Sequence, residues 1–267
     1  MPIMHKIDIK PISEDKFYQI DYKVMELAFA IHNEMGRFWD ETIYKNELAR
    51  RCREIGFEKV MTEAPVYACY DSFEKLHKID LLINNSIVYE LKTVRSLSED
   101  HLKQALHYLF LLGLQHGKLV NFRPESVEYR FVSTRLTPER RFNYKIIDSE
   151  YQTFDNDSAW LKNLITNLLK EWGAFLDINL FYEAINHFRG GKEHVVKEIT
   201  VACDSHILGE QSAHLLSPRT AFKISGVIRE TENYEKHLRR FIKYTELKAI
   251  QWINFNHHEI VFKTILK

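Results

Sequence analysis

The chain has 267 residues, of which 45% are hydrophobic and 13% aromatic, so it can bury a sizeable core and disorder is not expected. Lys and Arg together number 37, as do Asp and Glu, so the formal net charge is zero. The chain therefore lacks the general basic excess that by itself would indicate nucleic-acid binding. A local basic groove is still compatible with that neutral total.

The cysteines and the N-terminal residues indicate the cellular compartment. Cys52, Cys69 and Cys203 lie far apart and form no Cys-x-x-Cys pair, which excludes a zinc ribbon and disfavours a disulfide framework. We expect them to be ordinary buried or part-buried thiols. The N-terminal stretch MPIMHKIDIKPISEDK has no apolar signal core, and no later run reaches the roughly 18 apolar residues of a membrane span. The sequence therefore predicts a soluble, cytoplasmic protein without a membrane partner.

In the first half of the chain, apolar spacing predicts helices followed by strands. Helical periodicity at the start is interrupted at Gly36, and Ser98 is a favourable N-cap for a later Leu-rich helix. The predicted segments are, in order, two helices over 18–55, a strand over 57–70, a hairpin over 79–92, a helix over 99–115 and strands over 118–122 and 127–132.

In the second half the pattern restarts. A polar stretch rich in charge suggests a connector, so we divide the chain into a first module over 1–135, a connector over 136–157 and a second module over 158–267. The second module is predicted to contain helices over 158–188, strands over 194–203 and 219–228, a helix over 230–247 and two strands over 248–265.

Short strings in the two modules match at nearly constant offsets. LQHGKLVNF over 114–122 aligns with LKAIQWINF over 247–255 at an offset of 133, and GRFWD over 36–40 aligns with GAFLD over 173–177 at an offset of 137. The order of the predicted elements is similar as well. We infer two related α/β modules. Chance agreement between short apolar strings is the competing explanation.

The predicted hairpin over 79–92 carries three charges in an otherwise apolar run. Side chains alternate along a strand, so Glu90 and Lys92 share a face. If the loop is Asn84-Asn85 alone, Asp80 lies opposite Tyr89 on the other face. If the loop has three residues or the strand has a bulge, Asp80 lies opposite Glu90.

In the second case, two carboxylates about 5 Å apart at their Cβ atoms could bind one divalent cation such as Mg²⁺. Lys92 beside that ion could orient a water molecule and stabilise negative charge on phosphorus. The alternative is a surface hairpin whose charged face is only solvated. The apolar run around the charges, with Leu81, Leu82 and Ile87, instead favours a strand covered on both faces.

Asp80 followed by Glu90-Leu91-Lys92, on a hairpin between helices, resembles the core of the PD-(D/E)xK nuclease superfamily. The next helix contains Gln104 and Tyr108, which is similar to the Gln-x-x-x-Tyr motif of RecB-like nucleases. A spacing of four places these two side chains on one helix face. The resemblance covers about residues 18–133.

Within that superfamily the chain most resembles the bacterial GxxExxY family. Gly36 followed by Glu41 and Tyr44 is similar to the signature that names the family, and Lys118–Phe122 is similar to its penultimate strand. The chain departs from the signature at Phe38, which stands where the family has a glycine three residues before the glutamate. The resemblance implies a restriction-endonuclease-like α/β core, in which a mixed central sheet is flanked by helices. The internal repeat indicates that this core is duplicated.

The resemblance also implies roles for single residues, with Mg²⁺ or Mn²⁺ as the cofactor. Glu41 would approach the metal directly or through water, and Gln104 with Tyr108 would brace the site or touch the nucleic-acid backbone. The residues carried over are the metal ligands Asp80 and Glu90, the catalytic residues Lys92, Glu41, Gln104 and Tyr108, and the nucleic-acid contact Tyr44.

The second module lacks these groups. At the same offsets, Asp80, Glu90 and Lys92 are replaced by Ala213, Lys223 and Ser225, and Gln104 and Tyr108 by His237 and Phe241. If the repeat is real, this half is a catalytically dead copy that covers the first module, dimerises or extends a binding groove. Its helix carries a basic face, which either contacts phosphates or is simply solvated, the second reading being favoured. The candidate nucleic-acid contacts there are Arg239, Arg240 and Lys243.

The sequence therefore predicts a metal-dependent nuclease that hydrolyses phosphodiester bonds of DNA, or of RNA. One alternative is a non-catalytic module that docks onto nucleic acid or protein. Another is a nuclease subunit that is active only in a partner complex. A homodimer or a protein partner could form through the C-terminal half.

Overall fold

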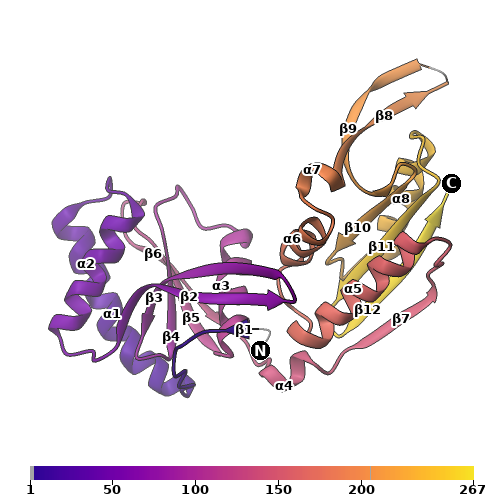
Figure 1. Cartoon of the computed structure of the whole chain (residues 1–267). Coiled ribbons are helices and arrows are strands. Elements are labelled where there is room, and N and C mark those ends of the chain that lie inside the picture. Colours follow the sequence, from indigo (N-terminus) through magenta and orange to yellow (C-terminus); the bar gives the residue numbers. More distant parts are fainter. Residues whose placement is uncertain (1–2, 205) are drawn as a thin grey trace. The chain divides into compact units, whose positions relative to one another are not determined.

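Two six-stranded mixed sheets with flanking helices organise the structure, a computed structural model that describes residues 3–204 and 206–267 (Figure 1). The chain divides into two compact units, Met1–Pro138 and Glu139–Lys267. Cys52, Cys69 and Cys203 are free thiols, as expected. Among the described helices, none has both the length and the apolar character needed to cross a bilayer.

The first unit follows the predicted order of helices and strands. Its sheet has the order β1-β2-β3-β4-β5-β6, and only β4 and β5 run parallel, because α3 connects them as a crossover. The elements are β1 (Ile3–Met4), α1 (Glu14–Met35), α2 (Glu41–Glu54), β2 (Val60–Tyr70), β3 (Phe73–Ile83), β4 (Ile87–Lys92), α3 (Glu99–Leu112), β5 (His116–Asn121) and β6 (Glu128–Ser133).

Helices α1 and α2 pack on one face of this sheet and bury Leu81, Tyr89 and Leu91. The predicted break at Gly36 is confirmed, because this residue ends α1 with a φ of 75°, a conformation that favours glycine. Tyr44 of α2 donates a hydrogen bond to the Gly36 carbonyl (2.6 Å) and stacks on Phe122. The helix–helix turn is therefore fixed from inside the core.

The hairpin β3–β4 has the three-residue loop that the sequence left as one of two alternatives. Leu81 pairs with Tyr89 and Ile83 with Ile87, so the loop is residues 84–86. Continued by one position, this register places Asp80 opposite Glu90. All six residues of β4 are buried, as expected for a strand covered on both faces.

The second unit has its own sheet, in the order β7-β12-β11-β10-β9-β8. Residues 136–157, expected as a connector, contain β7, which pairs in parallel with β12. The elements are α4 (Pro138–Arg141), β7 (Lys145–Glu150), α5 (Asn156–Trp172), α6 (Ile178–Phe188), α7 (Lys192–Val195), β8 (Val196–Cys203), β9 (His206–Ser217), β10 (Thr220–Ser225), α8 (Thr231–Lys243), β11 (Ala249–Asn256) and β12 (Glu259–Leu266).

Strand β9 was not predicted from the sequence. Its first seven residues are all exposed, so they show no alternation of buried and exposed side chains. In Figure 1, β8 and β9 form a hairpin that projects from the rest of the second sheet.

From its long helices onward, the second unit has the same strand pairings as the first. Two helices precede three antiparallel strands (β8, β9, β10), and a helix then leads to β11, which is parallel to β10 and antiparallel to β12. Lys92 pairs with Asn121 between β4 and β5, and Ser225 pairs with Asn254 between β10 and β11. Ser225 lies 133 residues after Lys92, and Asn254 lies 133 residues after Asn121, so the two pairs are related by the offset found in the sequence.

Candidate functional site

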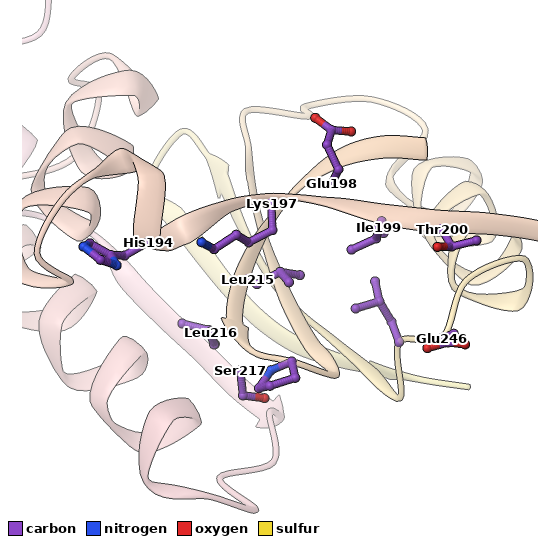
Figure 2. A pocket seen from close by; sticks show the side chains of 11 residues that line it. His194, Lys197, Glu198, Ile199, Thr200, Leu215, Leu216, Ser217 and Glu246 are labelled. Atoms are coloured by element: carbon purple, nitrogen blue, oxygen red, sulfur yellow. The ribbon is translucent and has the colours of Figure 1, made fainter. Parts of the chain in front are cut away.

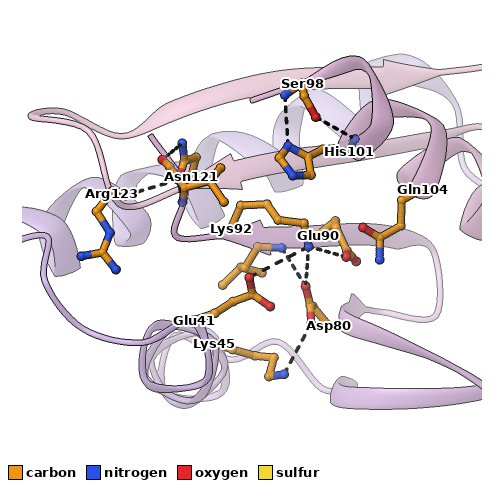
Figure 3. A network of polar contacts seen from close by, with 12 residues as sticks. Glu41, Lys45, Asp80, Glu90, Lys92, Ser98, His101, Gln104, Asn121 and Arg123 are labelled. Carbon is orange, nitrogen blue, oxygen red and sulfur yellow. Dashed lines mark hydrogen bonds and ion pairs between the residues drawn. The ribbon is translucent and has the colours of Figure 1, made fainter. Parts of the chain in front are cut away.

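The hairpin β3–β4 brings Asp80, Glu90 and Lys92 together in the first unit (Figure 3). The Lys92 ammonium lies 2.7 Å from Glu90 Oε1 and 3.9 Å from Asp80 Oδ2. The backbone N–H of Leu91 donates a hydrogen bond to the same oxygen, Asp80 Oδ2, over 2.9 Å. The three side chains are buried, with relative exposures of 7%, 2% and 9%.

Helix α2 adds two more charged residues to this cluster. Figure 3 shows Glu41 and Lys45 directed from the helix toward the hairpin. Glu41 Oε2 lies 4.0 Å from the Lys92 ammonium, and the buried Lys45 ammonium lies 3.4 Å from Asp80 Oδ1. Glu41 is the first residue of its helix, where the helix dipole favours a carboxylate.

Glu63 of β2 completes the cluster by an ion pair with Lys45. Its backbone has a φ of 51°, a left-handed conformation that costs free energy for any residue with a Cβ atom. The strained Glu63 thus lies beside the buried charges, as is common at functional sites.

Burial and like charge strongly perturb the carboxyl group of Glu90. Loss of solvent, and then the nearby charge of Asp80, raise its pKa to about 8, although Lys92 acts in the opposite direction. Glu90 Oε2 is buried and has no hydrogen-bond partner among the residues that the structure describes. Burial also raises the pKa of Glu41. The site therefore contains a buried carboxyl oxygen that could bind a cation or carry a proton.

The two lysines of the site remain cationic. Burial by itself would lower the pKa of Lys92, but the carboxyl groups of Glu90, Glu41 and Asp80 outweigh that effect and raise it. The pKa of Lys45 is raised in the same way, since its ion pairs with Glu63 and Asp80 outweigh burial.

The charges of the cluster do not balance. Carboxyl groups outnumber lysines by one, even when Lys78, which is 58% exposed, is counted at the rim. The carboxyl groups are Asp80, Glu90, Glu41 and Glu63, and the lysines are Lys92, Lys45 and Lys78. A bound divalent cation, or a proton on Glu90, would offset this excess of negative charge.

The donor set suits a hard divalent cation. Asp80, Glu90 and Glu41 supply carboxylate oxygens, the ligands that Mg²⁺ prefers, and Glu90 Oε2 is not otherwise engaged. Within the described residues, no three His, Cys, Asp or Glu side chains are already gathered as a ligand set. The Lys92 ammonium instead lies among the three carboxyl groups and acts as their counter-ion.

Helix α3 presents the predicted Gln104 and Tyr108 pair. Gln104 Nε2 donates a hydrogen bond to Tyr108 Oη over 3.0 Å, as the spacing of four residues allows. Burial, and then the charge of Glu90, raise the pKa of Tyr108 to about 12, so its hydroxyl group stays neutral. Ser98 precedes the first residue of the helix, and its side chain forms the predicted N-cap by accepting a hydrogen bond from the backbone N–H of His101 (Figure 3).

The predicted nucleic-acid contacts differ in their setting. Tyr44 has no exposed surface, and its hydroxyl group is used by Gly36, so its place is in the core rather than at a substrate. Arg239 and Arg240 are exposed on α8, where Arg239 pairs with Glu235, and Lys243 lies over the ring of Tyr244. A contact between this basic face and phosphate stays a prediction.

Sequence reasoning missed Lys45 and Glu63. Lys45 follows Glu41 by four residues, so helical spacing alone could have placed it on the same face. Nothing in the sequence marks Glu63, because its approach depends on the register between β2 and β3.

Comparison with known proteins agrees with this geometry. Residues 18–132 match the family model of the PD-(D/E)XK nuclease superfamily. The matched segment runs from α1 to β6 and contains Asp80, Glu90 and Lys92. No curated protein and no solved structure shows significant similarity to the chain. The mixed α/β architecture of the first unit is consistent with the fold of that superfamily.

Proposed function

We propose that the first unit is a metal-dependent nuclease that hydrolyses phosphodiester bonds of DNA, or of RNA. The observation that carries this proposal is the buried convergence of Asp80, Glu90 and Lys92 inside the segment that matches the nuclease superfamily. Buried ionisable groups with strongly perturbed pKa values are typical of catalytic sites.

Asp80 and Glu90 would hold Mg²⁺ or Mn²⁺, and Glu41 would approach from α2 directly or through water. A bound divalent ion supplies positive charge that polarises the phosphoryl group and makes water a stronger nucleophile. The unpartnered Glu90 Oε2 and the excess of carboxyl groups support this assignment.

Lys92 would act as a cation rather than as a base. Its raised pKa keeps it protonated at neutral pH, so it cannot accept the proton of the attacking water. It can orient that water and stabilise the negative charge that develops on the phosphoryl oxygens. In the reaction, a bond forms between the water oxygen and phosphorus, and the bond from phosphorus to the leaving oxygen breaks. The attacking water releases one proton to the solvent and the leaving oxygen takes one up, so that one water molecule is consumed.

Gln104 and Tyr108 would brace the site from α3. The hydrogen bond between them fixes both side chains, and the charge of Glu90 acts on the Tyr108 hydroxyl. A neutral hydroxyl group can donate a hydrogen bond to a carboxylate or to a phosphate oxygen. Whether the Tyr108 hydroxyl donates to a carboxylate or to a phosphate depends on the bound substrate.

We also assign the first unit to the GxxExxY type. In this reading Gly36 and Tyr44 form the turn that sets where α2 begins, and Glu41 reaches the charged cluster from that start. Phe38 replaces a glycine of the signature, and its ring is 77% exposed, so the longer side chain meets no steric obstacle there.

The second unit is proposed to be a degenerate copy of the first. Asn121 accepts from Val94 N–H and donates to Val94 O, and Asn254 makes the same pair of bonds with Val227. The offset of 133 relates both residues. Since Ala213, Lys223 and Ser225 replace the acidic pair and the catalytic lysine, this copy is proposed to bind nucleic acid or a partner chain without cutting.

The experiment that tests the proposed activity compares cutting of single- and double-stranded DNA and RNA with Mg²⁺, Mn²⁺ or a chelator. We expect metal-dependent cutting that Lys92→Ala abolishes. Lys103→Ala is the matched control, because Lys103 is a 72% exposed lysine of α3. Cutting that persists unchanged in Lys92→Ala would exclude the mechanism. If no substrate is cut but nucleic acid binds in a salt-sensitive way, the docking alternative or a missing partner subunit is favoured.

A further inference from the structure

A cavity of about 320 Å³ lies in the second unit between α8 and the strands β9 and β10. Ala213, Lys223, His237 and Phe241 are among its lining residues. These four stand at the offset of 133 from Asp80, Glu90, Gln104 and Tyr108. The cavity therefore occupies the place in the second unit that the charged cluster has in the first.

The strand register supports this equivalence independently of the sequence match. Ala221 of β10 pairs with Leu215 of β9, so the register places Lys223 opposite Ala213. The corresponding pair in the first unit is Glu90 opposite Asp80. Where the first unit has two facing carboxyl groups, the second has a lysine facing a methyl group. The site is thereby changed from one that suits a cation to one that suits an anion.

Lys223 is placed to bind that anion. It is the one exposed residue of β10, a strand with β9 on one side and β11 on the other. Within the described part of the chain, its ammonium makes no ion pair and no side-chain hydrogen bond with the protein. The charge of Lys223 acts on the cavity wall, since burial, and then Lys223 and Lys192, lower the pKa of His214.

Aromatic side chains form part of the wall. Phe241 and Tyr234 of α8 line the cavity, and Tyr234 stacks on Trp252 with ring centroids 5.4 Å apart and planes 27° apart. Aromatic side chains of this kind stack on nucleobases, whatever the base. The volume lies at the lower end of the range of small-molecule sites, about 300–1,000 Å³.

A second cavity in the same unit lacks this combination. It has a volume of about 520 Å³, and Figure 2 shows Lys197, Glu198 and Glu246 among its lining side chains. Both signs of charge are present there, and none of the lining residues is Phe, Tyr or Trp. A negatively charged, aromatic ligand therefore suits the cavity at Lys223 and not this one.

We propose that the cavity at Lys223 binds a nucleoside phosphate. The phosphate contacts the ammonium of Lys223, with His237 beside it, and the base packs against Phe241 and Tyr234. The nucleoside phosphate is either a free mononucleotide or one nucleotide of a single strand. Binding of a nucleotide within a single strand rests on the proposed nuclease function of the first unit. Binding of a free mononucleotide rests on the chemistry of the cavity alone.

The test measures binding to the full chain in the presence of a chelator, so that no metal contributes. The probes are adenosine 5′-monophosphate, followed by calorimetry, and a fluorescent ten-nucleotide single strand, followed by anisotropy. Lys223→Glu should weaken the binding of either probe by about tenfold or more. Lys223→Ala should lower the slope of strand affinity against salt concentration by about 1, the value expected for the loss of one phosphate contact. Lys170→Glu, at an exposed lysine of α5, is the matched control and should leave binding unchanged.

Two comparisons keep this proposal separate from the proposed nuclease. Binding to the cavity should survive Lys92→Ala, whereas metal-dependent cutting should not. If the mononucleotide binds, the ligand is a free nucleotide. If only the single strand binds, the ligand is one nucleotide of a nucleic acid. Lack of binding by either probe, or equal affinity of Lys223→Glu and the unmodified chain, overturns the proposal. Circular dichroism and thermal unfolding show that each variant is folded.

Discussion

The ammonium group of Lys92 lies 2.7 Å from the Oε1 atom of Glu90, two residues earlier on the same buried strand. Neither group is stable alone in that setting, because an unpaired charge in a protein interior is costly. Each therefore depends on the other when no metal is bound. This dependence leads to the first three predictions.

Replacing Lys92 with Met should destabilise the metal-free protein by up to about 3 kcal/mol. The loss stays below the upper range for broken buried pairs, because Glu90 already carries a proton below about pH 8, so that removing Lys92 leaves no buried carboxylate without a counter-ion there. Urea unfolding in chelator measures the change, with Lys103→Met as the exposed control. A variant as stable as the parent would show that the Lys92–Glu90 pair does not stabilise the fold.

The stability of the metal-free protein should fall as the pH rises from about 4.5 to about 8. The pKa of Glu90 is about 8 in the folded state against a model value of 4.5, so the folded chain binds the extra proton across this window. The stability that this proton contributes is complete below the lower value and is lost as the pH rises through the upper one.

The control for this pH dependence is Glu90→Gln, which carries no titrating group at the position. Its unfolding free energy should change less over the same range of pH than that of the parent chain. Equal slopes in the two proteins would mean that another group is responsible.

Mg²⁺ should stabilise the protein more at pH 9 than at pH 6. Below about pH 8 a metal must displace the proton of Glu90, whereas above it the carboxylate is already free to bind. Thermal unfolding with and without Mg²⁺ gives the shift at each pH. The same shift in Asp80→Asn and in the parent chain would place the metal elsewhere.

The sequence was sufficient to predict most of the helices and strands and much of this cluster. Alternation along a strand puts Glu90 and Lys92 on one face, and helical spacing puts Gln104 beside Tyr108. Both relationships are local, so they follow from residue spacing. The position of Asp80 depended on the length of a loop, and only the structure distinguished the two registers.

Other features depend on contacts between distant segments and could not be read from the sequence. Glu63 reaches the cluster through the pairing of β2 with β3, and Lys45 is identified as part of it by its contact with Asp80. Strand β7 lacks a strong apolar pattern, because it lies at the edge of its sheet and has no buried residue. Tyr44 illustrates the converse case, since a motif residue expected at the substrate lies in the core.

The conformation of Glu63 gives a prediction about backbone strain. Glu63 has a φ of 51° in the structure. The variant Glu63→Gly should therefore be more stable than Glu63→Ala by about 1 kcal/mol, because glycine adopts this conformation without the clash of a Cβ atom. Both variants lose the ion pair with Lys45 equally, so the difference between them reports the backbone alone. Urea unfolding of the two variants measures it.

The matched control is Glu74, an exposed residue of β3 whose φ is not positive. There Gly should be less stable than Ala by roughly 0.5–1 kcal/mol, because glycine loses more conformational freedom when a strand forms. Opposite signs at the two positions are expected. The same sign at both would show that β2 relaxes around position 63, and that the strain beside the charged cluster is not part of the folded state in solution.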